Sequence, residues 1–161
     1  MEARINYAQH DPEVISAMLS FHKYVMKSRL EESLLDLVVT RASQINHCAY
    51  CLDMHFKDAL TSGETVQRLY SLDAWRECPY YSERERAALA WTEAVTLVTE
   101  GFVPDEVYEQ ARAQFTESEL IGLTMAIIGI NGWNRLNVSF RMVPGDYQSQ
   151  RKPAVPALAH A

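Results

Sequence analysis

Two cysteines and a histidine stand close together in the stretch HCAYCLDMHF, which covers residues 47–56. Two residues separate Cys48 from Cys51, and His55 follows four positions after Cys51. Side chains three or four residues apart share a helix face, so we expect these groups to line up, with Cys51 and His55 within reach. An imidazole there can take the thiol proton and stabilise the reactive thiolate. The first turn of a helix also favours an anion, and cysteines one turn apart can close a disulfide.

A carboxylate could complete this set by orienting the imidazole. Asp36 lies on a polar stripe of the preceding predicted helix. If the chain reverses at residues 46–47, a helical rise of ~1.5 Å per residue brings Asp36 nearly level with His55. Glu93 is a second candidate, because a carboxylate on so apolar a helix is either paired or has a raised pKa. We therefore expect Asp36 or Glu93 to act as a proton acceptor.

Metal binding is the main alternative for a C-x-x-C pair. A structural zinc site uses four ligands, whereas Cys48, Cys51 and His55 supply three. Cys78 or His47 could complete such a site, although we interpret Cys78 as an inert loop thiol and His47 as a capping or exposed residue. The residue types therefore favour redox chemistry over zinc, and no metal or organic cofactor is expected.

Composition limits the remaining classes of function. The chain has 161 residues, a formal net charge of -6 and a pI of about 5.3. A chain this acidic, without a basic run, is not expected to bind nucleic acid or an anionic membrane. Its longest apolar run, at 120–130, is too short to span a bilayer, and the first residues do not resemble a signal peptide. A cytoplasmic location is the default expectation.

Helical periodicity runs through the whole chain and predicts an all-α fold. The predicted helices cover residues 12–28, 30–45, 48–63, 64–75, 82–101 and 104–115, with a further one from residue 116. Capping boxes at Ser82 and Thr116 mark two starts, and Gly63 suits the position just after a helix. The apolar helix from residue 116 is expected in the core or a subunit interface, with Gly122 and Gly129 allowing close packing. We predict one helical domain over residues 1–143 and a Pro/Ala-rich arm over 144–161, either flexible or lying on a neighbour.

The stretch LLDLVVTRASQINHCAYCLDMHFKDAL resembles the alkylhydroperoxidase D (AhpD)-like branch of the carboxymuconolactone decarboxylase superfamily. The stretches SERERAALAWTEAV and AIIGINGWNRLNVSFR are also similar to it, so the resemblance covers about residues 30–140. It implies an AhpD-like helical bundle assembled into a homo-oligomer, often a trimer or hexamer.

For the peroxidase members, the resemblance implies that Cys51 attacks a hydroperoxide, Cys48 resolves and His55 relays the proton. The family usually has a glutamate twelve residues before the first cysteine, and Asp36 holds that place here (48 − 36 = 12). Its side chain is shorter, and Glu93 could compensate. Decarboxylase members generally lack the dithiol, which argues against their activity here.

The function expected from the sequence is thiol-dependent reduction of a small hydroperoxide, an antioxidant activity. The resemblance implies an external thiol reductant, either lipoyl-bearing or thioredoxin-like. A general thiol–disulfide oxidoreductase or redox sensor would use the same cysteines without peroxidase turnover. Two further classes of protein stay open: a zinc-binding module, and a lactone enzyme that uses His55 with Asp36 or Glu93.

Overall fold

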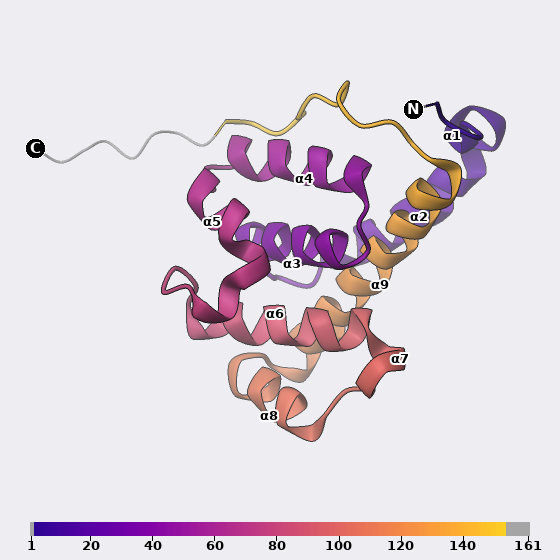
Figure 1. Cartoon of the computed structure of the whole chain (residues 1–161). Helices are drawn as coiled ribbons and strands as arrows, with labels where there is room; N and C mark the ends of the chain where they lie inside the picture. Colours follow the sequence, from indigo (N-terminus) through magenta and orange to yellow (C-terminus); the bar gives the residue numbers. More distant parts are fainter. Residues whose placement is uncertain (1, 154–161) are drawn as a thin grey trace, which may run out of the picture.

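The computed structural model describes residues 2–153, and within them the chain forms helices and no strand (Figure 1). The elements are α1 (Tyr7–His10), α2 (Pro12–Val25), α3 (Glu32–Ile45), α4 (Ala49–Thr61), α5 (Val66–Ser71), the 3-10 helix η1 (Leu72–Glu77), α6 (Glu83–Thr96), α7 (Val98–Gly101), α8 (Asp105–Gln114) and α9 (Glu117–Phe140). The all-α prediction is confirmed, with helix starts close to those expected.

Local capping chemistry explains several of these boundaries. The Ser82 and Thr116 side chains each accept a hydrogen bond from the backbone three residues on, and a glutamate there bonds back to the cap, which completes both predicted capping boxes. Asp11 caps α2, whose first residue is Pro12. Gly63 follows the end of α4 with a φ of 96°, a left-handed conformation that glycine adopts without strain.

Two predicted helices are divided in the structure. The segment predicted as a helix over residues 64–75 forms α5 and then η1, with a kink at Ala74. The helix predicted over residues 82–101 is interrupted at Leu97, which has a φ of -99° and a ψ of 33°. This interruption lies in the run VTLVT, where β-branched side chains lower helix propensity.

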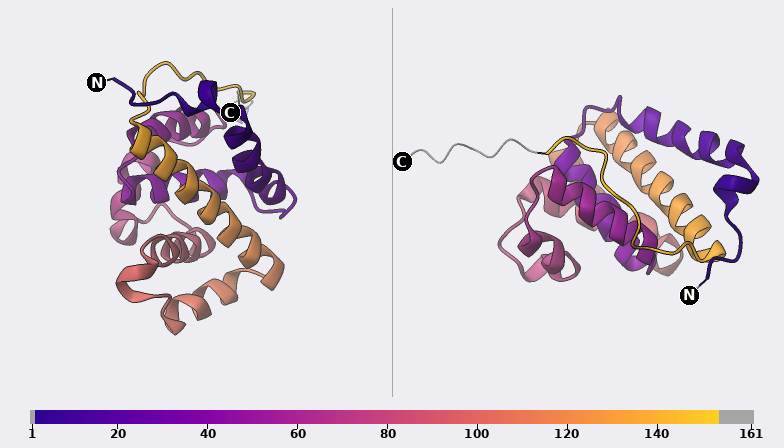
Figure 2. Two further views of the ribbon diagram at one scale, coloured as in Figure 1. Left: turned by 90° about the vertical axis from the view of Figure 1, so that its right-hand side faces the viewer. Right: turned by 90° about the horizontal axis from the view of Figure 1, so that it is seen from above.

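Helix α3 lies at the centre and packs against α4, α6 and α9, while α2 packs along α9 and α8 along α6 (Figures 1 and 2). The main core lies between α3, α6 and α9 and includes Val38, Ala88 and Ile127, each with 0% exposure. Glycines allow close packing on α9 as predicted: a Cβ at Gly129 would lie 3.3 Å from the Cβ of Phe21 in α2, and one at Gly122 would lie 2.5 Å from the Cβ of Ser28, just after α2. These contacts fix the α3–α4 pair relative to α9.

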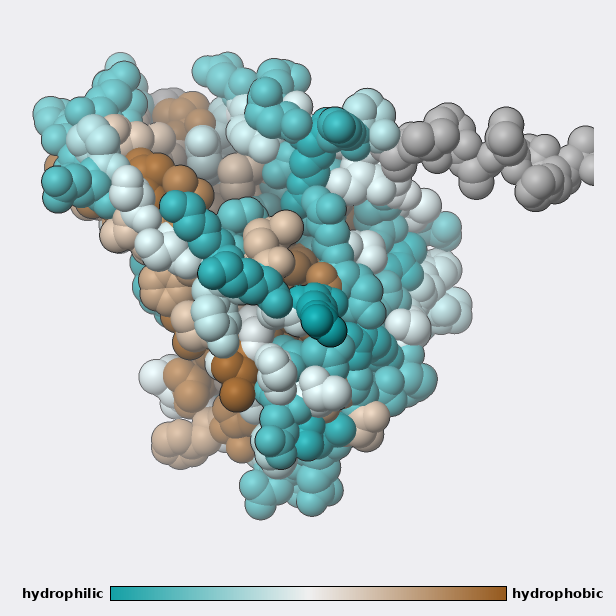
Figure 3. All heavy atoms as spheres, turned by 180° about the vertical axis from the view of Figure 1, so that it is seen from behind, coloured by the Kyte–Doolittle hydropathy of each residue, from teal (hydrophilic) through white to brown (hydrophobic). Residues whose placement is uncertain are grey.

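One side of α9 is nevertheless exposed. Ile121 and Ile128 are 57% and 44% exposed, and apolar side chains gather on one flank of the molecule seen from behind (Figure 3). The helix therefore packs in the core of its own chain on one side, and the subunit interface stays a prediction. None of the helices within residues 2–153 has the length and hydropathy needed to cross a membrane.

The segment after α9 runs as extended chain along α4 (Figures 1 and 2). Lys57 Nζ donates to the backbone oxygens of Gly145 and Tyr147, both at 2.9 Å, and the Gly145 N–H donates to Asp53 at 3.1 Å. The described part of the predicted arm therefore lies on helix α4 of its own chain. The rest of that arm, residues 154–161, lies outside the described residues.

Candidate redox site

The turn between α3 and α4 sets the position of the cysteines. The chain reverses at residues 46–47, where His47 is exposed and adopts a left-handed φ of 52°. The Asn46 amide donates to Asn131 and Asn134 of α9 at 3.0 and 2.9 Å. These bonds tie the turn to α9, so the first turn of α4 faces the middle of that helix.

Cys48 is the N-cap residue of α4 and Cys51 lies in its first turn. Both are free thiols, with exposures of 1% and 0%, and they pack against Ala42 and Ile130. The two thiols are close enough for each to influence the ionisation of the other. The prediction that the spacing brings the two sulfurs together at the start of a helix agrees with this geometry.

The interaction between the thiols separates their pKa values. The Cys51 thiol, together with the nearby N–H groups of Cys51 and Tyr50 and the Asn134 amide, lowers the pKa of Cys48 to about 7 against the opposing effect of burial. The same interaction with Cys48, burial and the charge of Cys48 raise the pKa of Cys51. In the reduced pair the negative charge therefore rests on Cys48 and the proton on Cys51, whereas the resemblance implies attack by Cys51.

Asparagine side chains of α9 face the pair. Asn137 Nδ2 donates to Cys51 Sγ at 3.2 Å, and Asn134 Nδ2 donates to Ser43 Oγ at 3.1 Å. These amides lower the pKa of Cys51, although burial and Cys48 outweigh them. These asparagines are not among the site residues predicted from the sequence. The sequence feature that could have identified them is the asparagine at every third residue of NGWNRLN, on an otherwise apolar helix.

His55 is buried, and neither ring nitrogen has a hydrogen-bond partner within residues 2–153. Burial lowers its pKa to about 4, and the positive charge of Arg151 adds to the shift while Asp58 opposes it. The imidazole is therefore neutral near pH 7. The predicted relay from Cys51 to His55 is not joined by a direct hydrogen bond, and an imidazolium does not stabilise the thiolate.

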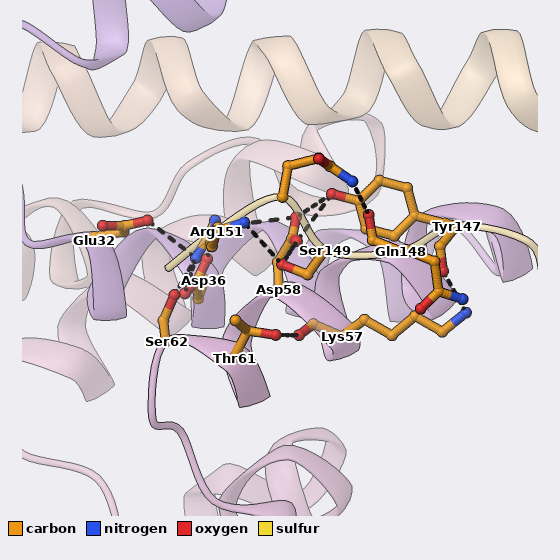
Figure 4. Close-up of polar contacts among 11 residues, drawn as sticks. Glu32, Asp36, Lys57, Asp58, Thr61, Ser62, Tyr147, Gln148, Ser149 and Arg151 are labelled. Carbon is orange, nitrogen blue, oxygen red and sulfur yellow. Dashed lines mark hydrogen bonds and ion pairs between the residues drawn. The ribbon is translucent and has the colours of Figure 1, made fainter. Parts of the chain in front are cut away.

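Asp36 does not bond to the imidazole as the sequence analysis expected. Its carboxylate, 2% exposed, accepts two hydrogen bonds from Arg151 at 2.6 and 2.8 Å (Figure 4). Burial raises the pKa of Asp36, and the guanidinium opposes that rise. The carboxylate whose charge acts on His55 is Asp58, three residues further along the same helix. The reason for the difference is Arg151, which pairs with Asp36 from the far end of the chain.

The arm surrounds Asp58 with donors. Tyr147 and Ser149 donate their hydroxyl hydrogens to this carboxylate at 2.9 and 2.6 Å, and Arg151 Nη1 donates to Ser62 Oγ at 3.0 Å (Figure 4). The arm thus covers α4 on the side that carries Asp58. These residues were not predicted as site residues, because nothing in the local pattern of the arm indicates where it lies.

Glu93 lies in a separate ion-pair cluster. Its carboxylate accepts hydrogen bonds from Arg41 at 2.8 Å, Trp75 Nε1 at 2.9 Å and Arg76 at 2.5 Å. These bonds lower its pKa despite the opposing effect of burial. Within the described residues no hydrogen bond joins Glu93 to the cysteines or to His55. Of the two expected alternatives, a partner or a raised pKa, the first therefore applies, because three donors pair with the carboxylate.

A large surface hollow lies away from the dithiol. A hollow of about 530 Å³ lies between η1, α6 and α8 and is lined by Trp75, Arg76 and Arg86 among others, but by none of the predicted site residues. In the part of the chain that the structure describes, no group of three or more His, Cys, Asp or Glu is arranged to hold a metal ion. Cys78 lies apart from the pair, half-buried, with its thiol directed at the Ser71 carbonyl at 3.9 Å.

Known proteins resemble the chain in both sequence and fold. YdfG, an uncharacterised protein of Bacillus subtilis, is 40% identical over 139 residues, which are 86% of this chain and 95% of YdfG. A protein of unknown function from Agrobacterium tumefaciens, provisionally assigned to AhpD antioxidant defence, is 42% identical with a TM-score of 0.87, over 91% of this chain and 100% of that one.

The fold also matches a more distant structure. An uncharacterised peroxidase-related protein of Ralstonia eutropha, described as an alkylhydroperoxidase AhpD core, has a TM-score of 0.76 at 20% identity, over 86% of this chain and 74% of that one. The family model for carboxymuconolactone decarboxylases matches residues 12–94, which contain both cysteines and His55. With an AhpD-like helical fold and this match over more than half its length, the chain belongs to the carboxymuconolactone decarboxylase family.

Proposed function

We propose that this protein is a thiol-dependent hydroperoxide reductase that uses Cys48 and Cys51 as its redox pair. One observation carries the proposal: two buried thiols lie three residues apart at the start of one helix, and the Asn137 amide donates to the Cys51 sulfur at 3.2 Å. A thiolate at neutral pH is the species that attacks an O–O bond. A second sulfur at bonding range converts the resulting sulfenic acid into a disulfide before further oxidation.

The reaction begins with a proton transfer inside the pair. The Cys51 proton passes to the neighbouring Cys48 thiolate and leaves a thiolate on Cys51. That thiolate attacks the distal oxygen of ROOH, so that an S–O bond forms, the O–O bond breaks and RO⁻ departs. RO⁻ takes the proton from Cys48, and the Cys48 thiolate then displaces hydroxide from the Cys51 sulfenic acid to give the disulfide. Cys51 is the attacking sulfur in this scheme because the Asn137 amide donates to it.

His55 is suited to bind the peroxide group. Its two ring nitrogens are buried without partners in the described chain, and a neutral imidazole offers one donor and one acceptor. A hydroperoxide also has an O–H donor and acceptor oxygens, so pairing with the ring satisfies both. With a pKa of about 4, His55 can transfer a proton during the reaction but does not remain protonated at neutral pH.

The substrate needs a local opening to reach the sulfurs, whose exposures are 1% and 0%. The C-terminal arm is held on the α3–α4 pair by polar contacts, such as the ion pair between Arg151 and Asp36 of α3. Segments held in this way open at lower free energy than core helices. We therefore assign the access motion to the arm.

The relatives support a peroxidase-related role. The Agrobacterium protein has been provisionally assigned to AhpD antioxidant defence, and this chain covers 100% of it at 42% identity. The reductant in our proposal is a lipoyl-bearing or thioredoxin-like thiol, which attacks the disulfide and restores the dithiol. Assembly into a trimer or hexamer is part of the proposal, with the exposed side of α9 as the candidate interface.

Single-cysteine variants test the proposal. Cys48→Ser and Cys51→Ser, each combined with Cys78→Ser, are treated with a stoichiometric organic hydroperoxide, and the products are mapped by mass spectrometry. We expect a sulfenic acid, or its overoxidised form, on Cys51 in the Cys48→Ser protein. Oxidation confined to Cys48 in the Cys51→Ser protein would show that the roles are reversed. The unaltered protein should consume peroxide when a dithiol is supplied, and failure to do so refutes the peroxidase.

The same preparations distinguish the peroxidase from its rivals. A thiol–disulfide oxidoreductase or redox sensor forms the Cys48–Cys51 disulfide but does not turn over peroxide with a supplied dithiol. A zinc-binding module, in contrast, contains stoichiometric zinc when purified in the reduced state. An acid–base enzyme acting on lactones keeps its activity after both cysteines have been replaced.

A further inference from the structure

A hydrogen-bonded chain connects the N-terminal segment to the redox pair. The Tyr7 hydroxyl donates to Asn137 Oδ1 at 2.6 Å, and Asn137 Nδ2 donates to Cys51 Sγ at 3.2 Å. All three side chains are buried, with exposures of 7%, 4% and 0%. Tyr7 and Asn137 both lie outside residues 12–94, the part of the chain that matches the family model.

The orientation of the Asn137 amide follows from the protonation of Tyr7. Burial, with smaller contributions from Tyr50 and the two cysteines, raises the pKa of Tyr7 to about 12, so its hydroxyl keeps its hydrogen at neutral pH. The hydroxyl donates to the amide oxygen, and the N–H₂ group is thereby turned toward Cys51. A buried amide held on both sides has little freedom to rotate.

Tyr7 is itself fixed from two directions. Its ring lies against that of Phe140, with centroids 5.8 Å apart. The backbone N–H of Arg4 donates to the Phe140 carbonyl at 2.8 Å, and the Arg4 guanidinium donates to the Ser139 carbonyl at 3.1 Å. The N-terminal segment is therefore docked on the end of α9, one turn from Asn137.

We propose that Asn137 is a catalytic residue that stabilises negative charge on the Cys51 sulfur, and that Tyr7 is the positioning residue that aims its amide. This inference rests on the proposed function, because charge develops on Cys51 when its proton passes to Cys48. An N–H donor aimed at a buried sulfur favours the anion, and no cation within hydrogen-bonding distance of Cys51 in residues 2–153 supplies that stabilisation.

The test isolates Cys51 and measures its ionisation directly. In a Cys48→Ser/Cys78→Ser protein Cys51 is the remaining thiol of the chain, which has 3 cysteines. The thiolate is titrated by its ultraviolet absorbance, and its alkylation rate is measured at fixed pH. Asn137→Leu in this background should raise the Cys51 pKa by about one unit, and so lower the alkylation rate near neutral pH about tenfold.

A double-mutant cycle tests the role of Tyr7. We expect Tyr7→Phe to slow alkylation by about threefold when Asn137 is present, and to have no further effect in Asn137→Leu. The double variant replaces both polar partners with apolar groups of similar shape, so its fold should be preserved. Thr124→Val, in the first half of α9, is the matched control because its hydroxyl bonds to Trp91 and to the Leu120 carbonyl, and not to sulfur or to the α3–α4 turn.

The outcomes separate this inference from the proposed function. An unchanged Cys51 pKa in Asn137→Leu overturns the inference, and so does an equal shift in Thr124→Val. Additive effects of Tyr7→Phe and Asn137→Leu overturn the positioning role of Tyr7. Failure of the unaltered protein to consume peroxide refutes the peroxidase instead, while the Cys51 titration still tests the role of the amide.

Discussion

Replacing Arg151 with alanine breaks the pair that fastens the C-terminal arm. The guanidinium bonds to both oxygens of Asp36, at 2.6 and 2.8 Å, and that carboxylate is 2% exposed. Removing one partner of a fully buried pair typically costs about 3–5 kcal/mol. The Arg151 side chain is 27% exposed, and the arm can lift to let water reach Asp36. We therefore expect the free energy of unfolding to fall by about 2–3 kcal/mol at neutral pH.

The loss should depend on pH, because Asp36 can take up a proton. Burial raises its pKa above the ordinary 3.8, and Arg151 limits that rise. Without the guanidinium the pKa rises further. A carboxylate with a raised folded-state pKa binds more protons in the folded state, so its contribution to stability falls as the pH increases from 3.8 through that pKa. The destabilisation should thus be smallest near about pH 4 and grow toward neutral pH.

Urea unfolding at a series of pH values measures this effect by linear extrapolation. Arg112→Ala is the matched control, since its partner Glu117 lies 3.5 Å away and is 83% exposed, and such a pair contributes less than about 1 kcal/mol. In an Asp36→Asn background the pH-dependent part of the Arg151→Ala effect should vanish. An unchanged unfolding midpoint in Arg151→Ala, or a loss equal at all pH values, refutes the assignment of Arg151 as the partner of Asp36.

Further expectations follow from the groups around the site. Cys48 should alkylate faster as the pH rises through about 7. Cys51→Ser replaces the main group that lowers the Cys48 pKa, so it should move the midpoint of the plot of alkylation rate against pH. A midpoint near the ordinary thiol pKa in the unaltered protein contradicts the assignment. His55, neutral when folded, should make the protein less stable by about 3 kcal/mol as the pH falls from 6.5 to about 4, and calorimetry should find this acid sensitivity reduced in His55→Phe. Glu93→Gln should lower the free energy of unfolding by about 1–3 kcal/mol without changing the rate of peroxide consumption by the folded protein. A large loss of that rate would show that Glu93 takes part in the reaction.

The features predictable from the sequence are those that depend on neighbours along the chain. The Ser82 and Thr116 caps join residues three apart, and the structure contains both capping boxes. The two cysteines are also three apart, so the helix that begins at Cys48 fixes their relation. The periodicity of 3.6 residues that assigns the helices is equally local. The fold class and the dithiol therefore followed from the sequence.

The partners of the carboxylates depend on contacts that no local pattern encodes. Arg151 reaches Asp36 across 115 positions of the chain, and Arg41 reaches Glu93 across 52. A carboxylate on a buried helix face was correctly read as needing a partner or a raised pKa. Which of these applies depends on tertiary packing: Asp36 has both a partner and a raised pKa, whereas Glu93 has three donors and a lowered one.

The burial of the dithiol also decides what kind of group can stabilise its charge. The sequence suggested an imidazolium beside Cys51, but a fully buried imidazole loses its proton below pH 7, and here its pKa falls to about 4. Neutral donors are not affected in this way, because a side-chain amide or a backbone N–H keeps its hydrogen at any pH near neutral. The structure supplies such donors from Asn137 and from the first turn of α4. Salt should therefore have little effect on the reactivity of the dithiol, since dipoles that lie at hydrogen-bonding distance are not screened as exposed charges are.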